Sequence, residues 1–114
     1  MAIQQLQQKD SEMSECIDNC SEAAQACEVC ADACAEEGEE MARCLRLCRD
    51  VADLASLHAR FMTRESEFHA ELASVCANAF EECRDECEQF DMDHCQTCVE
   101  VLEPAIESCR SMAA

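Results

Sequence analysis

The 114-residue sequence has one glycine, one proline and no tryptophan or tyrosine, and its only aromatic residues are four phenylalanines. A β-rich fold needs glycine- and proline-containing turns, so their scarcity argues against strands. Lysine occurs once, at Lys9, and the formal net charge is -18. A surface this acidic argues against nucleic acid and anionic membranes as partners. The length suits one domain, which we expect to span residues 1–114 and to be helical.

Cysteine is abundant instead, with thirteen residues whose spacing follows a helix. Within each cluster, successive cysteines stand three, four or seven residues apart, which returns their side chains to one helical face. The predicted inward-facing thiols are Cys16, Cys20, Cys27, Cys30, Cys34, Cys44, Cys48, Cys76, Cys83, Cys87, Cys95, Cys98 and Cys109. A disulfide framework does not need this periodicity, and an odd number cannot be fully paired. The pattern predicts a helical core lined with sulfur.

Apolar residues and cysteines recur with helical spacing in four segments, which we place at about 3–37, 39–62, 65–89 and 92–112. Because the connections are short, we predict an all-α, antiparallel up-down-up-down four-helix bundle with a cysteine-lined core. Gly38 is expected to end the first helix, Thr63 or Ser66 to cap the third, and Asp91 to cap the fourth. Pro104 lies inside the fourth segment and is expected to kink or break it, because proline lacks a backbone donor.

In such a bundle the cysteines lie at different heights, which can be counted from the turns at about 1.5 Å per residue. The expected upper layer contains Cys34, Cys44, Cys87 and Cys95. The layer one turn below contains Cys30, Cys48, Cys83 and Cys98. The other five cysteines form a sparser lower region, which includes Cys27.

The opposite end of the bundle is expected to be apolar. The residues of this apolar plug are Leu6, Leu54, Leu57, Phe61, Phe68, Leu72 and Ile106. His58 and His69 fall in the same half and are expected to pack in the plug or lie at the surface. The sequence thus predicts a sulfur-lined tube that is open at one end only.

A dense set of buried thiolates favours a soft ion, chiefly Cu(I). Cysteine pairs at i and i+4 place two sulfurs on one side of a helix, which suits the low coordination number that Cu(I) tolerates. Zn(II) prefers four closed ligands, so a single zinc site would leave nine of the thirteen cysteines unexplained. One monovalent ion per thiolate also keeps the buried charge near neutral. We therefore predict storage or sequestration of Cu(I) without catalysis, on the order of ten ions per chain.

Three further residues fall beside the upper turns, where an ion would enter, and complete the predicted metal-binding set: Met41, Met92 and His94. The first residues, MAIQQLQQKDSEM, lack the charged start and apolar run of an export signal. We therefore expect the protein in the cytoplasm, where thiols stay reduced.

Three alternatives remain open at this point. A structural Zn(II) or iron–sulfur module would hold a small, fixed number of metals and unfold on chelation. A thiol redox sensor would use Cys27 with Cys30, or Cys95 with Cys98, although its reactive thiol would need exposure and a lowered pKa. In a purely structural bundle, the cysteines would only fill the core.

Four segments resemble the cysteine-rich four-helix-bundle copper storage proteins, and in particular their cytosolic branch. They are CLRLCRD at 44–50, MTRESEF at 62–68, EECRDECE at 81–88 and DMDHCQTC at 91–98. The resemblance implies many Cu(I) ions on the cysteine thiolates, an entry role for Met92 and His94, and a homotetramer. It also implies copper ions, exchanged with a copper chaperone or chelator, as the partner. Apolar residues replace the cysteines expected of richer members, which implies a smaller capacity: Leu54, Phe80, Leu102 and Ile106.

Overall fold

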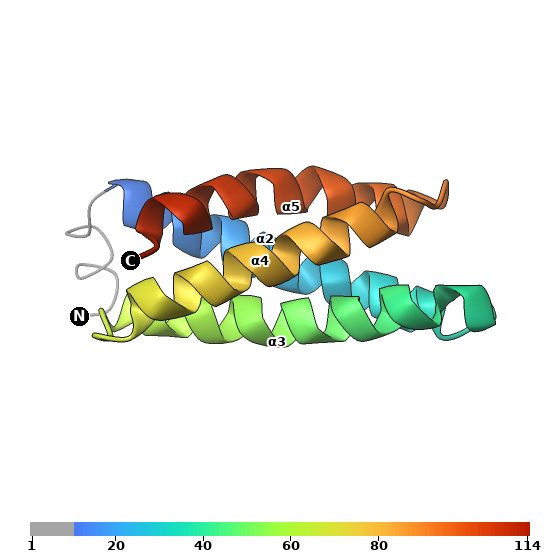
Figure 1. The fold of residues 1–114 in the computed structure, drawn as a ribbon, viewed down its shortest axis with the longest axis horizontal. Helices are drawn as coiled ribbons and strands as arrows, with labels where there is room; N and C mark the ends of the chain where they lie inside the picture. Colours follow the sequence, from blue (N-terminus) through green and yellow to red (C-terminus); the bar gives the residue numbers. More distant parts are fainter. Residues whose placement is uncertain (1–10) are drawn as a thin grey trace.

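The computed structural model describes residues 11–114, which form four α-helices and one 3₁₀ turn (Figure 1). The elements are α2 (Ser11–Cys34), η1 (Glu39–Met41), α3 (Ala42–Thr63), α4 (His69–Cys87) and α5 (Asp93–Met112). Residues 3–10 of the first predicted helix, with Leu6, lie outside the described residues. No helix within residues 11–114 combines the length and apolarity needed to cross a membrane.

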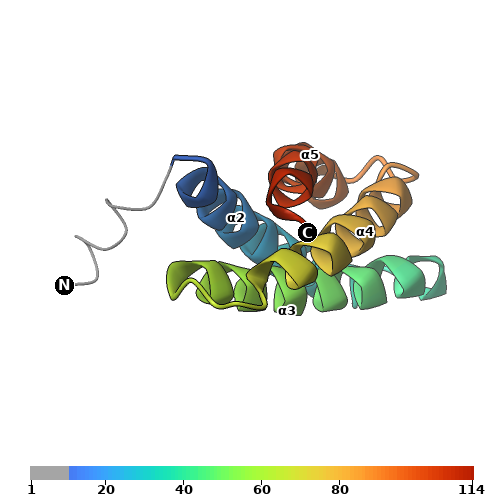
Figure 2. The ribbon, with the colours of Figure 1, turned by 60° about the vertical axis from the view of Figure 1, so that its left-hand side comes forward.

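The helices form the predicted antiparallel up-down-up-down bundle (Figures 1 and 2). Each helix packs against the next in the order α2, α3, α4, α5, and α5 closes the ring against α2. The turns from α2 to α3 and from α4 to α5 lie together at one end, here called the upper end (right in Figure 1). The α3–α4 turn and the C-terminus lie at the other, lower end. The all-α, four-helix fold predicted from the sequence is therefore confirmed.

The helix ends differ from the predicted ones in their capping residues. Helix α2 ends at Cys34, and Gly38 follows in the connection with a φ of 105°, a conformation that favours glycine. Thr63 is the last residue of α3, and its hydroxyl donates to the Ala59 carbonyl, so it does not cap α4. Helix α4 instead begins after Phe68, whose backbone N–H is bound by the Ser66 hydroxyl in the preceding turn.

Asp91 does not cap α5 either, because the residue at the N-cap position is Met92, without a side-chain hydrogen bond. Of the predicted kink or break at Pro104, the break does not occur, since α5 continues through this residue to Met112. Pro104 is exposed, and its carbonyl accepts a 3.4 Å hydrogen bond from the Asn19 side chain on α2. Asn19 also donates to the Ser108 hydroxyl at 2.7 Å. These contacts tie α2 to α5 beside the proline.

The core is built mainly from cysteine and alanine, with few large side chains. The fully buried large residues are Phe80, Met41, Met62, Leu102, His58 and Val51. The predicted apolar plug is wrong in this respect: of its described members only Ile106 is buried, and Phe68 is 56% exposed. Small side chains allow the helices to approach closely, so thiols from different helices can meet along the bundle axis.

Candidate metal centre

All thirteen cysteines are free thiols, and none is more than 2% exposed. The helical spacing of the cysteines therefore has the predicted result, because every thiol lies in the core. Full burial opposes the redox-sensor alternative, which needs an accessible thiolate. Twelve of the thirteen thiols divide into two sets that lie towards opposite ends of the bundle.

The larger set, here called the upper array, has members on all four helices. It consists of Cys27, Cys30, Cys34, Cys44, Cys48, Cys83, Cys87, Cys95 and Cys98. Neighbouring helices bring sulfur atoms into contact, with Cys44 and Cys87 at 3.7 Å and Cys48 and Cys83 also at 3.7 Å. These distances join α3 to α4 through sulfur along one side of the core.

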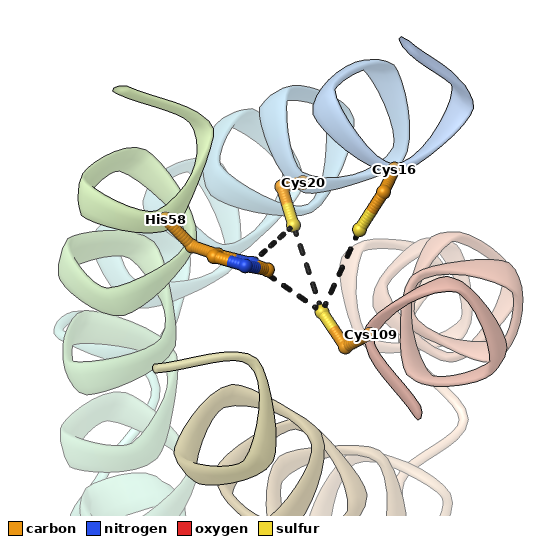
Figure 3. Close-up of side chains that lie close together, drawn as sticks. All are labelled: Cys16, Cys20, His58 and Cys109. Carbon is orange, nitrogen blue, oxygen red and sulfur yellow. Dashed lines mark hydrogen bonds between the residues drawn. The ribbon is translucent and has the colours of Figure 1, made fainter. Parts of the chain in front are cut away.

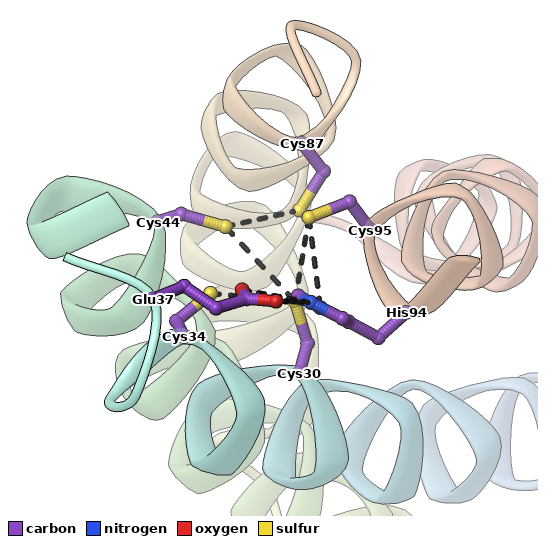
Figure 4. A network of polar contacts seen from close by, with 7 residues as sticks. All are labelled: Cys30, Cys34, Glu37, Cys44, Cys87, His94 and Cys95. Atoms are coloured by element: carbon purple, nitrogen blue, oxygen red, sulfur yellow. Dashed lines mark hydrogen bonds and ion pairs between the residues drawn. The ribbon is translucent and has the colours of Figure 1, made fainter. Parts of the chain in front are cut away.

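Cys30 lies within 4.0 Å of three other sulfur atoms of the upper array (Figure 4). Its Sγ lies 3.9 Å from that of Cys34 and 4.0 Å from those of Cys44 and Cys95. Cys30 belongs to one possible ligand group with Cys44, Cys48 and Cys87, whose sulfurs all lie within 4.8 Å of one another. Cys48 belongs in turn to a second group, with Cys27 and Cys98. The ligand groups of the upper array therefore share members, as bridging thiolates do.

The two layers predicted from the sequence are present only in part: Cys44 meets Cys87 and Cys48 meets Cys83 as predicted, but other contacts cross between the layers. Cys30 meets Cys44 and Cys95, two members of the layer predicted above it. Cys27, which was expected in the sparse lower region, belongs to the upper array through Cys48 and Cys98. The helices are tilted relative to one another (Figure 2), so residues counted to equal depth on different helices do not lie at equal heights.

His94 lies at the mouth of the upper array, between the thiols and a carboxylate (Figure 4). Its Nδ1 is 3.1 Å from the Sγ of Cys30 and 3.6 Å from that of Cys95. Its Nε2 lies 3.0 Å and 3.2 Å from the two carboxylate oxygens of Glu37, in the turn after α2. A carboxylate on the far nitrogen fixes the ring orientation of a metal-binding histidine. Glu37 was not expected from the sequence, because a turn residue has no periodicity to reveal it.

Two other members of the predicted metal-binding set, Met41 and Met92, lie near the upper turns. Met41 is 1% exposed and belongs to the hydrophobic core, whereas Met92 is half-buried at the start of α5. Their role in ion entry stays a prediction. Nearby, Arg43 on α3 forms an ion pair with Glu86 on α4, with its guanidinium 2.8 Å from the carboxylate.

The smaller set is a compact group of three thiols and one imidazole, here called the lower cluster (Figure 3). Its members are Cys16 and Cys20 on α2, His58 on α3 and Cys109 on α5. The Sγ of Cys109 lies 4.0 Å from that of Cys16 and 3.8 Å from that of Cys20. The Nδ1 of His58 lies 3.6 Å from Cys20 and 3.7 Å from Cys109.

His58 is buried, as one of its two predicted positions required, but its surroundings differ from the predicted ones. The histidine is fully buried, but it faces thiols instead of an apolar plug. A usable signal was present, because His58 continues the inward stripe of Cys44, Cys48, Val51 and Ala55 on α3. His69 is half-buried and lies outside both sets. Cys76, the remaining cysteine, has its Sγ 3.6 Å from the Leu54 carbonyl.

The buried thiols differ widely in pKa. Burial raises the pKa of Cys34 to about 12, because an apolar environment disfavours the thiolate. Hydrogen bonding with Cys109 raises the pKa of Cys16 to about 12. Hydrogen bonds from Cys16 and Cys20 lower the pKa of Cys109 to about 6. In the upper array, hydrogen bonds from Cys27 and other thiols lower the pKa of Cys98 to about 5. Within each set the pKa values therefore diverge, lowered for Cys109 and Cys98 and raised for Cys16 and Cys34.

Comparison with known proteins identifies relatives along most of the chain. The family model for copper storage proteins matches residues 9–114. The cysteine-rich protein YhjQ of Bacillus subtilis strain 168 is 39% identical over 101 residues, which cover 87% of this chain and 94% of that protein. The structure of the Cu(I)-bound copper storage protein BsCsp3 has a TM-score of 0.85 and 37% identity, and covers 91% of this chain and 100% of its own. The copper storage protein Ccsp of Streptomyces lividans, loaded with 10 copper equivalents, has a TM-score of 0.88 and 26% identity, with coverages of 98% and 97%.

Proposed function

This chain belongs to the copper storage protein family, and on that premise we propose that it stores several Cu(I) ions on the thiolates of its core. The observation that carries the proposal is the upper array, in which eight of the nine buried cysteines belong to ligand groups with shared members and the ninth, Cys83, contacts Cys48. Shared thiolates can bridge two ions, so the number of ions can approach the number of sulfurs. A capacity on the order of ten ions per chain follows for soft, monovalent copper.

Charge and solvent exclusion favour the same ion. Each Cu(I) offsets one thiolate, so a filled array buries little net charge, whereas divalent ions at equal density would leave an excess of positive charge. The empty thiols behave as small apolar side chains, which allows the bundle to fold before it is loaded. Copper therefore acts as cargo, and we propose that the chain holds it without catalysing a reaction.

We propose that copper enters at the upper end and is first held there by His94. Its Nδ1 faces Cys30 and Cys95, and its side chain is 14% exposed, which places it between solvent and the buried sulfurs. From Cys30 an ion can pass to Cys44 without leaving sulfur ligands, because the two sulfurs lie 4.0 Å apart. Met41 and Met92 are proposed as further ligands at this entrance, and a copper chaperone or chelator as the donor.

Two other features are proposed together with this function. A cytoplasmic location is supported by the free thiols, and a related copper storage protein of Streptomyces lividans is described as cytosolic. A homotetramer is the expected assembly, as implied by the resemblance of the sequence to the family. Light scattering of the purified protein tests it, and a mass of one or two chains would contradict it.

Anaerobic titration with Cu(I) against a competing coloured chelator tests storage directly. We expect the chelator to stay metal-free until on the order of ten ions have bound each chain. A matched pair of variants locates the ions: Cys48→Ser removes a thiol shared by two ligand groups, and Ser56→Cys adds one outside them. The first should lower the capacity and the second should not raise it by more than one ion. Saturation of the wild-type protein at one or two ions would refute the proposal.

A further inference from the structure

The lower cluster differs from the upper array in that its ligands are not shared. Cys16, Cys20, His58 and Cys109 form one group, and none of them belongs to another ligand group within residues 11–114. In the upper array, by contrast, both Cys30 and Cys48 take part in more than one group. Four donors that together form one ligand group describe a mononuclear site; beyond them, Cys109 contacts only the single thiol of Cys76, which completes no second ligand group within residues 11–114.

The distances within the lower cluster match a tetrahedron around a small cation. With zinc–sulfur bonds of about 2.3 Å and a zinc–nitrogen bond of about 2.0 Å, the tetrahedron has edges of about 3.8 Å between sulfurs and about 3.5 Å between sulfur and nitrogen. The observed sulfur–sulfur distances from Cys109 are 3.8 Å and 4.0 Å. The observed distances from the His58 nitrogen to sulfur are 3.6 Å and 3.7 Å. Four of the six edges are therefore close to those of a zinc tetrahedron, and the other two, which join Cys16 to Cys20 and to His58, are at most 4.8 Å.

Burial and charge also point to a divalent ion at this end. All four side chains are fully buried, and the imidazole Nδ1 of His58 points at the sulfurs (Figure 3). The other ring nitrogen, Nε2, is buried without a hydrogen-bond partner among residues 11–114, so the only polar contacts of this ring are with the cluster. One divalent cation offsets two of the three thiolates, whereas a single Cu(I) offsets only one and leaves more buried negative charge.

We propose that Cys16, Cys20, His58 and Cys109 form a mononuclear site for Zn(II), distinct from the Cu(I)-binding upper array. Three sulfurs and one imidazole in a closed tetrahedron are a donor set of structural zinc sites. The ligands come from α2, α3 and α5, so the ion joins three of the four helices at the lower end. Bound zinc would hold α2, α3 and α5 together at the lower end of the bundle, whether or not the upper array contains copper. The proposal does not depend on copper storage, since it uses no residue of the array.

The test uses the full-length, metal-free protein without oxygen and one equivalent of Co(II), a spectroscopic probe for tetrahedral zinc sites. Three variants are compared with the wild type. The double variant Cys16→Ser/Cys109→Ser disrupts the lower cluster, and Cys44→Ser/Cys87→Ser is the matched control, because it also removes two sulfurs in contact. His58→Cys keeps four donors but replaces nitrogen by sulfur.

We expect the wild type to give the ligand-field bands of tetrahedral Co(II) with thiolate charge transfer, which one equivalent of Zn(II) abolishes because zinc binds such sites more tightly. The bands should be lost in the lower-cluster variant, persist in the control and move to lower energy in His58→Cys. The shift in His58→Cys decides the matter even if the double variant fails to fold. Bands that are absent in the wild type, unchanged in His58→Cys or lost only in the control would overturn the proposal.

A second measurement separates zinc from copper at this site. Native mass spectrometry of the zinc-loaded protein during addition of Cu(I) should show one zinc retained while the first several coppers bind. Release of zinc by the first equivalent of Cu(I) would show that the lower cluster is a further copper site and would overturn the zinc assignment. Neither outcome alters the predicted capacity of the upper array, so the two proposals fail independently.

Discussion

Replacing Glu37 by alanine tests the role of the carboxylate behind His94. The two Glu37 oxygens lie 3.0 Å and 3.2 Å from Nε2, and this contact holds Nδ1 towards Cys30, 3.1 Å away. Loss of such a partner typically costs about 10–100-fold in metal affinity or activity. The Glu37 side chain is 31% exposed, so water replaces part of the contact, and we expect the lower end, about tenfold. A tenfold change corresponds to about 1.4 kcal/mol.

The assay is stopped-flow transfer of Cu(I) from a coloured chelator to the metal-free protein. Glu37→Ala should slow the first phase about tenfold and leave the final capacity unchanged, because it removes no sulfur. Glu37→Gln keeps an acceptor oxygen and should therefore slow the first phase less than Glu37→Ala does. Glu36→Ala is the control, since it removes the same charge from an exposed neighbour. Equal slowing in Glu36→Ala, or wild-type loading in Glu37→Ala, would refute the positioning role.

Three further predictions concern capacity, helix stability and pH. Cys44→Ser should lower the Cu(I) capacity by about two ions, because the Cys44 thiolate can bridge two centres. Cys76→Ser should lower the capacity by at most about one ion, because Cys76 lies outside both sets of thiols. Titration against a chelator measures both capacities. Pro104→Ala should stabilise the metal-free bundle by about 1–3 kcal/mol in urea denaturation, because alanine restores a helical donor; no change would contradict this. Folding raises the pKa of Cys16 and Cys34 from 9.0 to about 12, so the unfolded chain releases these protons at lower pH than the folded chain. The free energy of unfolding should therefore fall as the pH rises above about 9. A free energy of unfolding that does not change from about pH 8 to about pH 11 would contradict this.

The sequence predicted the fold and the inward direction of all thirteen thiols because both depend on helical periodicity alone. It predicted only some of the contacts between thiols, such as those of Cys44 with Cys87 and of Cys48 with Cys83. Counting residues from a turn assumes parallel helix axes, but the helices are tilted (Figure 2). Cys27, which was expected lower in the core, forms one ligand group with Cys48 and Cys98. A contact between helices depends on their tilt and register, neither of which is contained in a spacing of three or four residues.

The lower end shows a different limit of sequence reasoning. Leucine and phenylalanine residues around His58 suggested an apolar plug, yet most of them remain partly exposed while the histidine is buried among thiols. The cap at Asp91 and the kink or break at Pro104 were predicted from local preferences, whereas α5 has Met92 at its N-cap position and continues through the proline. Glu37 lies in a turn and contacts Nε2 of His94, so only the folded arrangement brings it to the predicted metal-binding residues.

Crystallographic location of copper in the Cu(I)-loaded protein, by anomalous scattering at the copper absorption edge, tests the central claim most directly. We predict a continuous row of copper atoms within the upper array, each bound by cysteine sulfurs, beginning at Cys30 beside His94 and reaching Cys27 and Cys98. Copper found only on the acidic surface, or at a single position in the core, would contradict storage in the sulfur-lined core.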